Sequence, residues 1–451
     1  MQHANQITRL TALAVGIAGV LAFGQAHGAA FQLKENSAKG LGKAFAGSIS
    51  APGDASVVAT NPAAMRQLDG RQFQFDLSAI SFSADFEGSG RHVGPTGPGS
   101  GTPISGGNGG DAGMIAPVPA AYLHLPMGEQ AHVGVSLTAP FGFKTEYDND
   151  WVGRYHGIKT DLKAIDLGLS ASYDVNPYLS FGASVFVEHL TIELSNAIDF
   201  GTMLYGSGVP GFAPGNADGL VNIKGDNNEV GFTVGGLFSV SEDTHIGLSY
   251  RSKVKHDITG GEARFDVPPN AAAVLAVARP GWFTDTQGRA SLTLPASATL
   301  SFTHNLSDQW TVMGDVSRTA WKPSFDQVTI EFDSPQADNA LEFGYRDTTF
   351  ASLGAEYRMS ETVTLRGGLA YDETPTTAAH RDVRVPDVTR KWLSLGVGWT
   401  PSPNIEYNIG YTHLFTSDPT IDLVQKDTMS SLAGSYDVGG DILAASINYK
   451  F

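Results

Sequence analysis

The stretch ILAASINYKF, residues 442–451, decides the fold class because its side chains alternate with a period of two. One set is apolar and the other mixes apolar with polar side chains, as in a β-strand with two different faces. The same alternation occurs at 363–371 and 405–411, so the sequence predicts an all-β protein. The apolar set of the last stretch is Leu443, Ala445, Ile447, Tyr449 and Phe451, and the mixed set is Ile442, Ala444, Ser446, Asn448 and Lys450.

From residue 71 onward the sequence predicts fourteen strands whose connections alternate between short and long. Met127–Gln130 and Val175–Pro177 are short, whereas 85–113 and 195–227 are long. Short turns at one end and long loops at the other are the layout of an antiparallel transmembrane β-barrel of the outer membrane. The even number places both barrel ends on the periplasmic side. The predicted strands are 71–84, 114–126, 131–141, 160–174, 178–194, 228–240, 244–258, 288–306, 309–321, 346–358, 361–372, 390–400, 404–415 and 440–451.

A soluble β-sandwich would also alternate, but the length of these segments favours a membrane barrel. Globular strands usually have about 5–6 residues, whereas tilted membrane strands need about 9–11. Tryptophans near strand ends are expected to form an interfacial girdle, and the chain ends on an aromatic residue, Phe451. The six tryptophans are Trp151, Trp282, Trp310, Trp321, Trp392 and Trp399.

The first 28 residues are predicted to be a signal peptide. Arg9 precedes an apolar run from Leu10 to Phe23, and Ala26-His27-Gly28 offers small residues for cleavage after Gly28. A membrane anchor is the alternative, but a spanning helix needs about 20 apolar residues and the run from Leu10 to Phe23 is shorter.

Residues 29–70 lack the alternation and are predicted to form a hatch, or plug, inside the lumen of a barrel made by residues 71–451. The segment is too short to be an independent domain. A floppy periplasmic arm is the alternative, but it would leave several apolar side chains with nothing to pack against. Those side chains are Phe31, Leu33, Leu41, Phe45, Val57, Val58 and Met65.

Composition excludes several classes of function. The formal net charge is −17, which argues against nucleic acid as a partner. The chain has no cysteine, so disulfides, thiolate metal sites and a cysteine nucleophile are excluded. Neither His-Glu-x-x-His nor Gly-x-Ser-x-Gly occurs, so we expect no enzyme, no metal and no cofactor. A barrel hydrolase and an adhesion barrel remain as alternatives, and a monomer is the default.

Two regions stand out as candidate functional sites. Pro140-Phe141-Gly142 ends a regular strand where proline cannot donate to the ladder, so a break in the wall is expected there. Pro295 is expected to cause only a bulge or kink, and the glycine-rich run 88–113 is expected to be a mobile loop.

Two long loops are unusually apolar, and exposed apolar clusters commonly mark binding sites. We expect them to capture a hydrophobic ligand, although loops that pack on one another would look the same. Residues 271–278 in the second loop have a helix-forming composition. The capture residues would be Phe200, Leu204 and Phe212 in the first loop with Trp282 and Phe283 in the second.

Several motifs together resemble the FadL family (OmpP1/FadL/TodX) of outer-membrane transporters for long-chain fatty acids and other hydrophobic compounds. Any one is weak, but their order and spacing cover nearly the whole chain after the signal peptide. The motifs are Ala30-Phe31-Gln32-Leu33, Gly40-Leu41-Gly42-Lys43-Ala44-Phe45, Asn61-Pro62-Ala63, Thr145-Glu146-Tyr147, Tyr250-Arg251-Ser252-Lys253-Val254-Lys255, Ser291-Leu292-Thr293-Leu294-Pro295 and Pro386-Asp387 followed by Arg390, Trp392 and Ser394.

The resemblance implies passive uptake of long-chain fatty acids through a plugged fourteen-stranded barrel. Ligand would pass from a groove between loops to an inner pocket, then sideways into the membrane at a kink in the third strand. Gly142 matches the kink glycine of the family, Phe31 matches a residue that reaches into the pocket, and Asn61-Pro62-Ala63 matches a hatch motif. The expected partners are hydrophobic small molecules, outer-membrane lipid and lipopolysaccharide, and the barrel-assembly machinery through the strand that ends at Phe451.

One departure from the family concerns the basic residues that meet the carboxylate of the substrate. Asn196 stands where the first is expected, and 329–331 contains no cation where the second is expected. A buried carboxylate needs a paired charge or several donors, so uptake of neutral compounds such as monoaromatic hydrocarbons is the second reading. The cations left as alternatives are Arg251, Lys253, Lys255 and Arg366.

Overall fold

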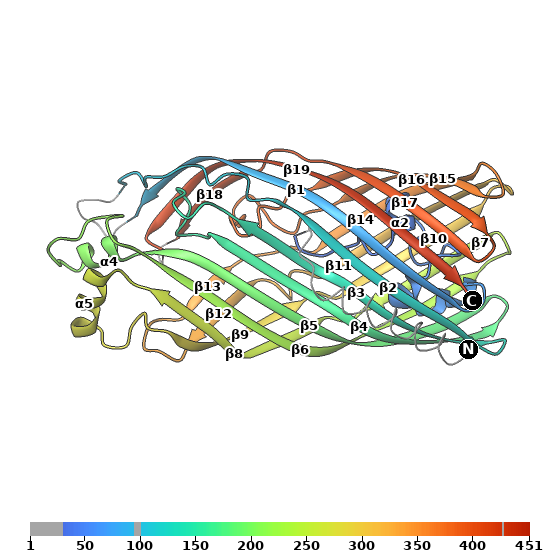
Figure 1. Ribbon diagram of the computed structural model, residues 1–451, viewed down its shortest axis with the longest axis horizontal. Helices are drawn as coiled ribbons and strands as arrows, with labels where there is room; N and C mark the ends of the chain where they lie inside the picture. Colours follow the sequence, from blue (N-terminus) through green and yellow to red (C-terminus); the bar gives the residue numbers. More distant parts are fainter. Residues whose placement is uncertain (1–29, 94–100, 426–427) are drawn as a thin grey trace, which may run out of the picture.

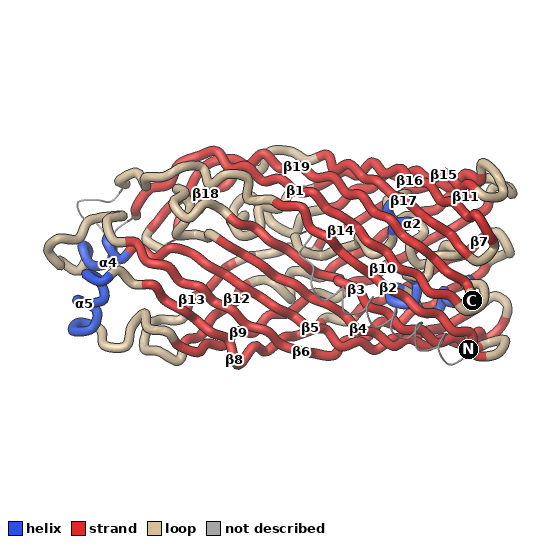
Figure 2. The backbone as a smooth tube through the Cα atoms, in the orientation of Figure 1, coloured by secondary structure: helices blue, strands red, loops and turns tan. Residues whose placement is uncertain are grey.

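The computed structural model describes residues 30–451 except 94–100 and 426–427. The predicted signal peptide, residues 1–28, lies outside the described residues. Strands make up most of the chain, with short helices at one end of the molecule and inside the other (Figure 2). None of the helices in the described part is long and apolar enough to cross a membrane.

The strands form one closed antiparallel sheet (Figure 1). The helices are α2 (Ala38–Leu41), α3 (Val57–Thr60), η1 (Pro62–Gln67), α4 (Phe200–Gly206) and α5 (Pro269–Ala278). The strands are β1 (Gln72–His92), β2 (Met114–Met127), β3 (Ala131–Glu146), β4 (Lys159–Asn176), β5 (Leu179–Asp199), β6 (Asp218–Ser239), β7 (Thr244–Arg251), β8 (Val254–Asp266), β9 (Thr286–Leu294), β10 (Ser297–Asn305), β11 (Trp310–Thr319), β12 (Gln327–Phe332), β13 (Asn339–Glu342), β14 (Thr348–Arg358), β15 (Val363–Asp372), β16 (Arg390–Ser402), β17 (Ile405–Phe415), β18 (Thr420–Gln425) and β19 (Ser430–Lys450).

The barrel wall has fourteen strands, as the sequence predicts. β7 and β8 are two segments of one wall strand, and β9 and β10 are two segments of another, while β12, β13 and β18 belong to loops. The barrel closes where β1 pairs with β19 from Gln72↔Lys450 to His92↔Ser430. This pairing leaves neither terminal strand with an open edge at the seam.

Two predicted strands are interrupted. Pro295 separates β9 from β10, as expected of a residue without an N–H. The prediction of one continuous strand at 244–258 was wrong, because the strand breaks at Ser252 and Lys253. There the Ser252 hydroxyl accepts the N–H of Phe232 over 2.9 Å and replaces a ladder bond.

Several strands are longer than predicted, and the start of the predicted loop at residue 88 was wrong. Residues 88–92 extend β1 and pair with the start of β19. A Cβ at Gly88 or Gly434 would lie within 2.8 Å of the Phe86 ring, so that ring covers both glycines and supports the pairing.

The outer and inner faces follow the alternation. Leu443 and Tyr449 are exposed on the outside at 55% and 45%, whereas Ile442 and Asn448 are buried inside. The predicted tryptophan girdle holds only in part. Trp310 and Trp399 are exposed, but Trp151, Trp321 and Trp392 are fully buried because they pack in the interior clusters.

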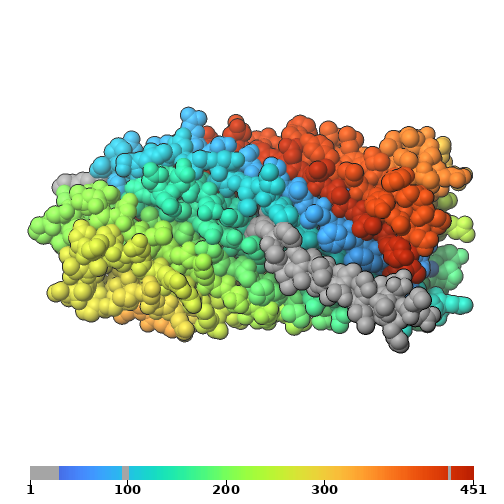
Figure 3. Space-filling view, in the orientation of Figure 1, coloured from blue at the N-terminus to red at the C-terminus, as the bar shows by residue number. Residues whose placement is uncertain are grey.

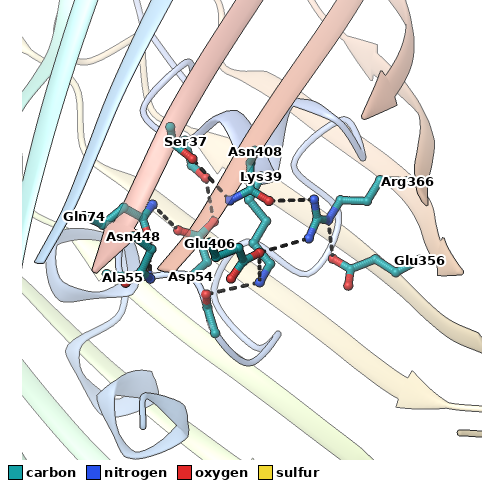
Figure 4. A network of polar contacts seen from close by, with 12 residues as sticks. Ser37, Lys39, Asp54, Ala55, Gln74, Glu356, Arg366, Glu406, Asn408 and Asn448 are labelled. Carbon is teal, nitrogen blue, oxygen red and sulfur yellow. Dashed lines mark hydrogen bonds and ion pairs between the residues drawn. The ribbon is translucent and has the colours of Figure 1, made fainter. Parts of the chain in front are cut away.

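The hatch segment, residues 30–70, packs against the inner face of the wall (Figure 1). Wall glycines permit this approach, since a Cβ at Gly396 would lie 2.7 Å from Gly42 and one at Gly410 would lie 2.5 Å from the Ala38 oxygen. Buried ion pairs add to the contact (Figure 4). Lys39 pairs with Glu406 of β17 at 3.3 Å.

Candidate functional site

The wall is incomplete between β2 and β3. Their ladder runs from Met127↔Ala131 to Ala121↔Leu137 and then stops, although both strands continue. In β3 the register with β4 shifts between Thr138 and Phe141, so the predicted irregularity at 140–142 is present. The prolines at 117 and 119 lie on the stretch of β2 without a partner on this side, an edge position where proline is tolerated.

The hatch segment takes the place of β2 beside the kinked strand. The Leu33 N–H donates to the Pro140 oxygen over 2.8 Å, and the Gly142 N–H donates to the Phe31 oxygen over 2.9 Å. Gln32 and Phe141 face each other between these bonds. The hatch segment therefore supplies hydrogen bonds that a wall strand would otherwise provide.

Aromatic rings surround the first residue of this pairing. Phe31 lies 4.7 Å from Trp321, 5.0 Å from Phe325 and 6.1 Å from Phe141, measured between ring centroids. All four side chains are buried. We call this group the aromatic floor, because an apolar cavity lies above it on the side of the long loops.

The apolar cavity is open on one side, and the space within its lining, open solvent included, is about 880 Å³. Its walls come from β3 to β6, β8, β9 and the β12–β13 hairpin, with Phe31 and Phe325 of the aromatic floor beneath. Aliphatic and aromatic side chains dominate the lining, which suits a hydrocarbon ligand. They include Phe143, Leu162, Ile192, Leu194, Ile223, Ile258, Leu292, Val328, Ile330, Leu341, Phe343 and Val385.

Arg384 is the buried cation of this lining. Its Nη2 donates to Asn196 Oδ1 over 3.0 Å, its Nη1 lies 3.5 Å from the Ser195 oxygen, and its Nε has no partner in the described part of the chain. No described carboxylate forms an ion pair with this guanidinium. Burial lowers the pKa of Arg384, with Asp382 opposing that effect. A buried guanidinium with a spare donor is suited to a carboxylate.

Arg384 lies in the loop between β15 and β16, and two residues of the resemblance motifs, at the end of β3 and just beyond it, bind the backbone of this loop. The Thr145 hydroxyl donates to the Arg384 oxygen over 3.0 Å, and the Tyr147 hydroxyl donates to the Val383 oxygen over 2.8 Å. Sequence reasoning missed Arg384. The only local signal is a charged residue between two valines, Val383 and Val385.

The cations proposed from the sequence do not lie free in the apolar cavity. Arg251 pairs with Asp166 and Glu188, each at 2.7 Å. Arg366 pairs with Glu356 and Glu406, and Glu406 also pairs with Lys39 of the hatch segment (Figure 4). Lys253 and Lys255 are exposed, and Lys255 pairs with Asp257.

Asn61-Pro62-Ala63 lies away from the apolar cavity and anchors the hatch segment to the wall. Asn61 Nδ2 donates to the Ile49 oxygen over 2.9 Å and to the Gly236 oxygen over 3.3 Å. A Cβ at Gly182 would lie 2.4 Å from the Ala63 nitrogen. The structure therefore separates this motif from Phe31, although both were predicted as site residues.

The two apolar loops meet at the end opposite the C-terminus, where the green and yellow segments lie side by side (Figure 3). Both contain a helix, and 271–278 is helical within α5 as predicted. Leu204, Trp282 and Phe283 line an open groove with an empty volume of about 2180 Å³. Phe200 and Phe212 instead form the buried core between the loops.

Sequence reasoning also missed a cation at this groove. The Arg279 guanidinium lies 4.3 Å from the centroid of the Trp282 ring and has no ion-pair partner among the described residues. Among all residues that the structure describes, no group of three or more acidic or histidine side chains could hold a metal ion.

Comparison with known proteins places these features in context. A family described as outer membrane protein transport protein (OMPP1/FadL/TodX) matches residues 19–451. The chain is 30% identical to the long-chain fatty acid transport protein of Escherichia coli O6:H1, over 91% of this chain and 92% of that protein. It is also 30% identical to outer membrane protein P1 of Haemophilus influenzae, over the full length of both. A crystal structure of a Pseudomonas aeruginosa FadL homologue covers 93% of this chain and 99% of its own, with 27% identity and a TM-score of 0.83.

Proposed function

This chain belongs to the OMPP1/FadL/TodX family of outer membrane transport proteins, and on that basis we propose that it carries long-chain fatty acids across the outer membrane by passive diffusion. The E. coli relative is named as a long-chain fatty acid transport protein. Diffusion down a gradient needs no cofactor and no catalytic group, so the proposal assigns the protein no enzymatic role.

The position of Arg384 carries the proposal. An acyl chain would fill the apolar cavity, where each buried methylene contributes about 0.8 kcal/mol. The carboxylate would accept hydrogen bonds from the guanidinium, whose Nε lacks a partner among the described residues and whose Nη2 donates to the neutral Asn196. Asn196, in β5, stands where the resemblance implies a basic residue, so the cation comes instead from the loop between β15 and β16.

The route would begin in the loop groove, with Leu204, Trp282 and Phe283 on the chain and Arg279 near the head group. From the apolar cavity the ligand would leave sideways, where β2 and β3 do not pair. The hatch segment would act as a plug that closes this exit until residues 31–33 move. Phe31 would be the gate residue.

We also infer the setting of the barrel. Both termini face the periplasm, the protein is a monomer, and outer-membrane lipid and lipopolysaccharide surround it. Phe451 lies at the short-turn end, where its N–H donates to the Arg71 oxygen over 3.0 Å. The strand that it ends would be recognised by the barrel-assembly machinery.

Uptake of neutral hydrophobic compounds is the second candidate. The apolar character of the cavity favours it, because apart from Arg384 its charged lining residues already have partners. Lys224 pairs with Glu193 and Arg289 pairs with Glu331, and both cations are more than half exposed.

Equilibrium binding to the refolded protein in detergent separates the two candidates. We expect oleic acid to bind about tenfold more tightly than methyl oleate or toluene, because a charged hydrogen bond contributes on the order of 1.5–3 kcal/mol. Arg384→Gln should remove this preference, whereas Arg318→Gln, at an exposed wall position, should keep it. Equal binding of acid and ester by the wild type, or a preference for toluene, would favour the neutral candidate.

A further inference from the structure

A second internal space, the polar chamber, borders the kink in β3. The space within its lining, open solvent included, is about 920 Å³, and residues 138–141 of the kink belong to that lining. The hatch segment separates it from the apolar cavity, because Phe31 lines the cavity whereas Gln32 and Lys34 line the chamber. Hydroxyl side chains of the wall cover its other side. They are Thr233, Ser249, Ser297, Thr299 and Ser317.

Lys34 brings an unpaired charge into this chamber. Of the lysines in the described hatch segment, Lys39 pairs with Glu406 at 3.3 Å and Lys43 pairs with Glu356 at 3.2 Å. The Lys34 ammonium has no ion-pair partner among the described residues and lies 4.3 Å from the centroid of the Phe350 ring.

The other charged groups of the chamber already have partners. Asp315 accepts hydrogen bonds from the N–H groups of Gly47 and Ser48 and from the Ser301 hydroxyl. Arg251 is held by its two carboxylates in the wall. Lys34 is therefore the charged group of the chamber without an ion pair in the described chain, with the carboxylates of Asp372, Asp315 and Glu35 acting on it from farther away, and a ligand that it meets would be an anion.

We propose that Lys34 forms a second binding site for the carboxylate of an amphiphile, on the exit side of the aromatic floor. The inference rests on the proposed function, since it supplies the next position for a head group that leaves Arg384. A carboxylate that passes the floor without a partner would lose its solvation, and a nearby ammonium offsets that cost. The adjoining bulge at 138–141 gives the acyl chain a way toward the unpaired edge of β2.

Uptake measurements test this site in cells whose own transporter is absent. We expect Lys34→Met to slow the uptake of oleate by about tenfold and to leave methyl oleate unchanged, because the ester has no charge to solvate. Lys391→Met, at an exposed position on the outside of β16, is the matched control and should transport both ligands normally.

A chemical measurement on the purified full chain reports on the same site without transport. Carbodiimide converts the carboxyl of oleic acid to an O-acylisourea, and an amine within reach attacks it to form an amide and release the urea. Burial lowers the pKa of the Lys34 amine, which favours attack. Mass spectrometry should find Lys34 acylated and Lys39 and Lys43 unmodified.

Two results would overturn the proposal: unchanged oleate uptake in Lys34→Met, or acylation of Lys34 no greater than that of Lys39 and Lys43. Either counts against this site even if Arg384→Gln weakens acid binding. Failure of the proposed function is a separate result, namely equal affinity of the wild-type protein for oleic acid and methyl oleate.

Discussion

The N–H of Gly142 donates a hydrogen bond to the carbonyl oxygen of Phe31 over 2.9 Å. One residue belongs to a barrel strand and the other to the hatch segment, 111 positions earlier in the chain. The bond exists because β3 has left β2 at this height, so its free backbone groups need another partner. A displacement of residues 31–33, the hatch tip, would expose both the aromatic floor and the unpaired edge of the wall.

The kink in β3 is predicted to set the rate of exit. Pro140→Ala with Gly142→Val should favour a regular strand that pairs with β2, and oleate uptake should fall while the barrel still inserts. Heat-modifiable migration checks insertion. Pro295→Ala changes the other strand interruption and should leave uptake unchanged. Normal uptake by the correctly folded double variant would contradict exit at the kink.

The loop groove is predicted to capture the ligand, an effect that matters when the ligand concentration is low. Trp282→Ala should raise the oleate concentration for half-maximal uptake by about three- to tenfold, equivalent to about 0.7–1.4 kcal/mol, with an unchanged maximal rate. The comparison variant is Val277→Ala, an exposed apolar position on α5 outside the groove lining. A lower maximal rate in Trp282→Ala would instead indicate a role after capture.

Buried ion pairs are predicted to hold the body of the hatch segment. Lys43→Met removes a charge whose side chain is 2% exposed and should lower the free energy of unfolding by about 3 kcal/mol, measured in urea. Lys450→Met breaks the exposed pair with Asp69 and should cost less than about 1 kcal/mol. Equal losses of unfolding free energy in the two variants would mean that burial of the Lys43 pair adds nothing to stability.

Glu35 is predicted to make stability depend on pH. Burial raises the pKa of this carboxyl to about 7, and its Oε1 has no partner in the described structure. The folded protein therefore retains a proton that the unfolded chain loses, so stability falls as pH rises from about 4.5 to about 7. Glu35→Gln should remove on the order of 3 kcal/mol of this fall between pH 5 and pH 8. Identical profiles of stability against pH for the wild type and the variant would contradict this role of Glu35.

The barrel could be predicted because alternation is a local property. Each strand buries one face, so a stretch such as 442–451 carries its own evidence. Strand ends were harder, because the extension of β1 to His92 depends on pairing with β19 at the other end of the chain. Trp151, Trp321 and Trp392 were misplaced, since lumen packing and a membrane girdle favour the same residue type.

The candidate site was less predictable than the fold. The break at Pro140 could be inferred because proline lacks a donor, and Phe31 came from the resemblance. Arg384 could not be found from spacing, since its position depends on contacts with Thr145 and Asn196, 239 and 188 residues away. Groups that are brought together by long loops leave no periodic signal.

The central claim, that ligand leaves where the hatch tip pairs with β3, is most directly tested by locking the two together. Gln32 and Phe141 face each other as a non-hydrogen-bonded antiparallel pair, a geometry with Cα atoms about 4.5 Å apart that accommodates a disulfide. The chain has no other cysteine. In Gln32→Cys with Phe141→Cys, oleate uptake should be lost on oxidation and return on reduction, while neither single variant responds. Equal uptake by the oxidised and reduced double variant would contradict the account.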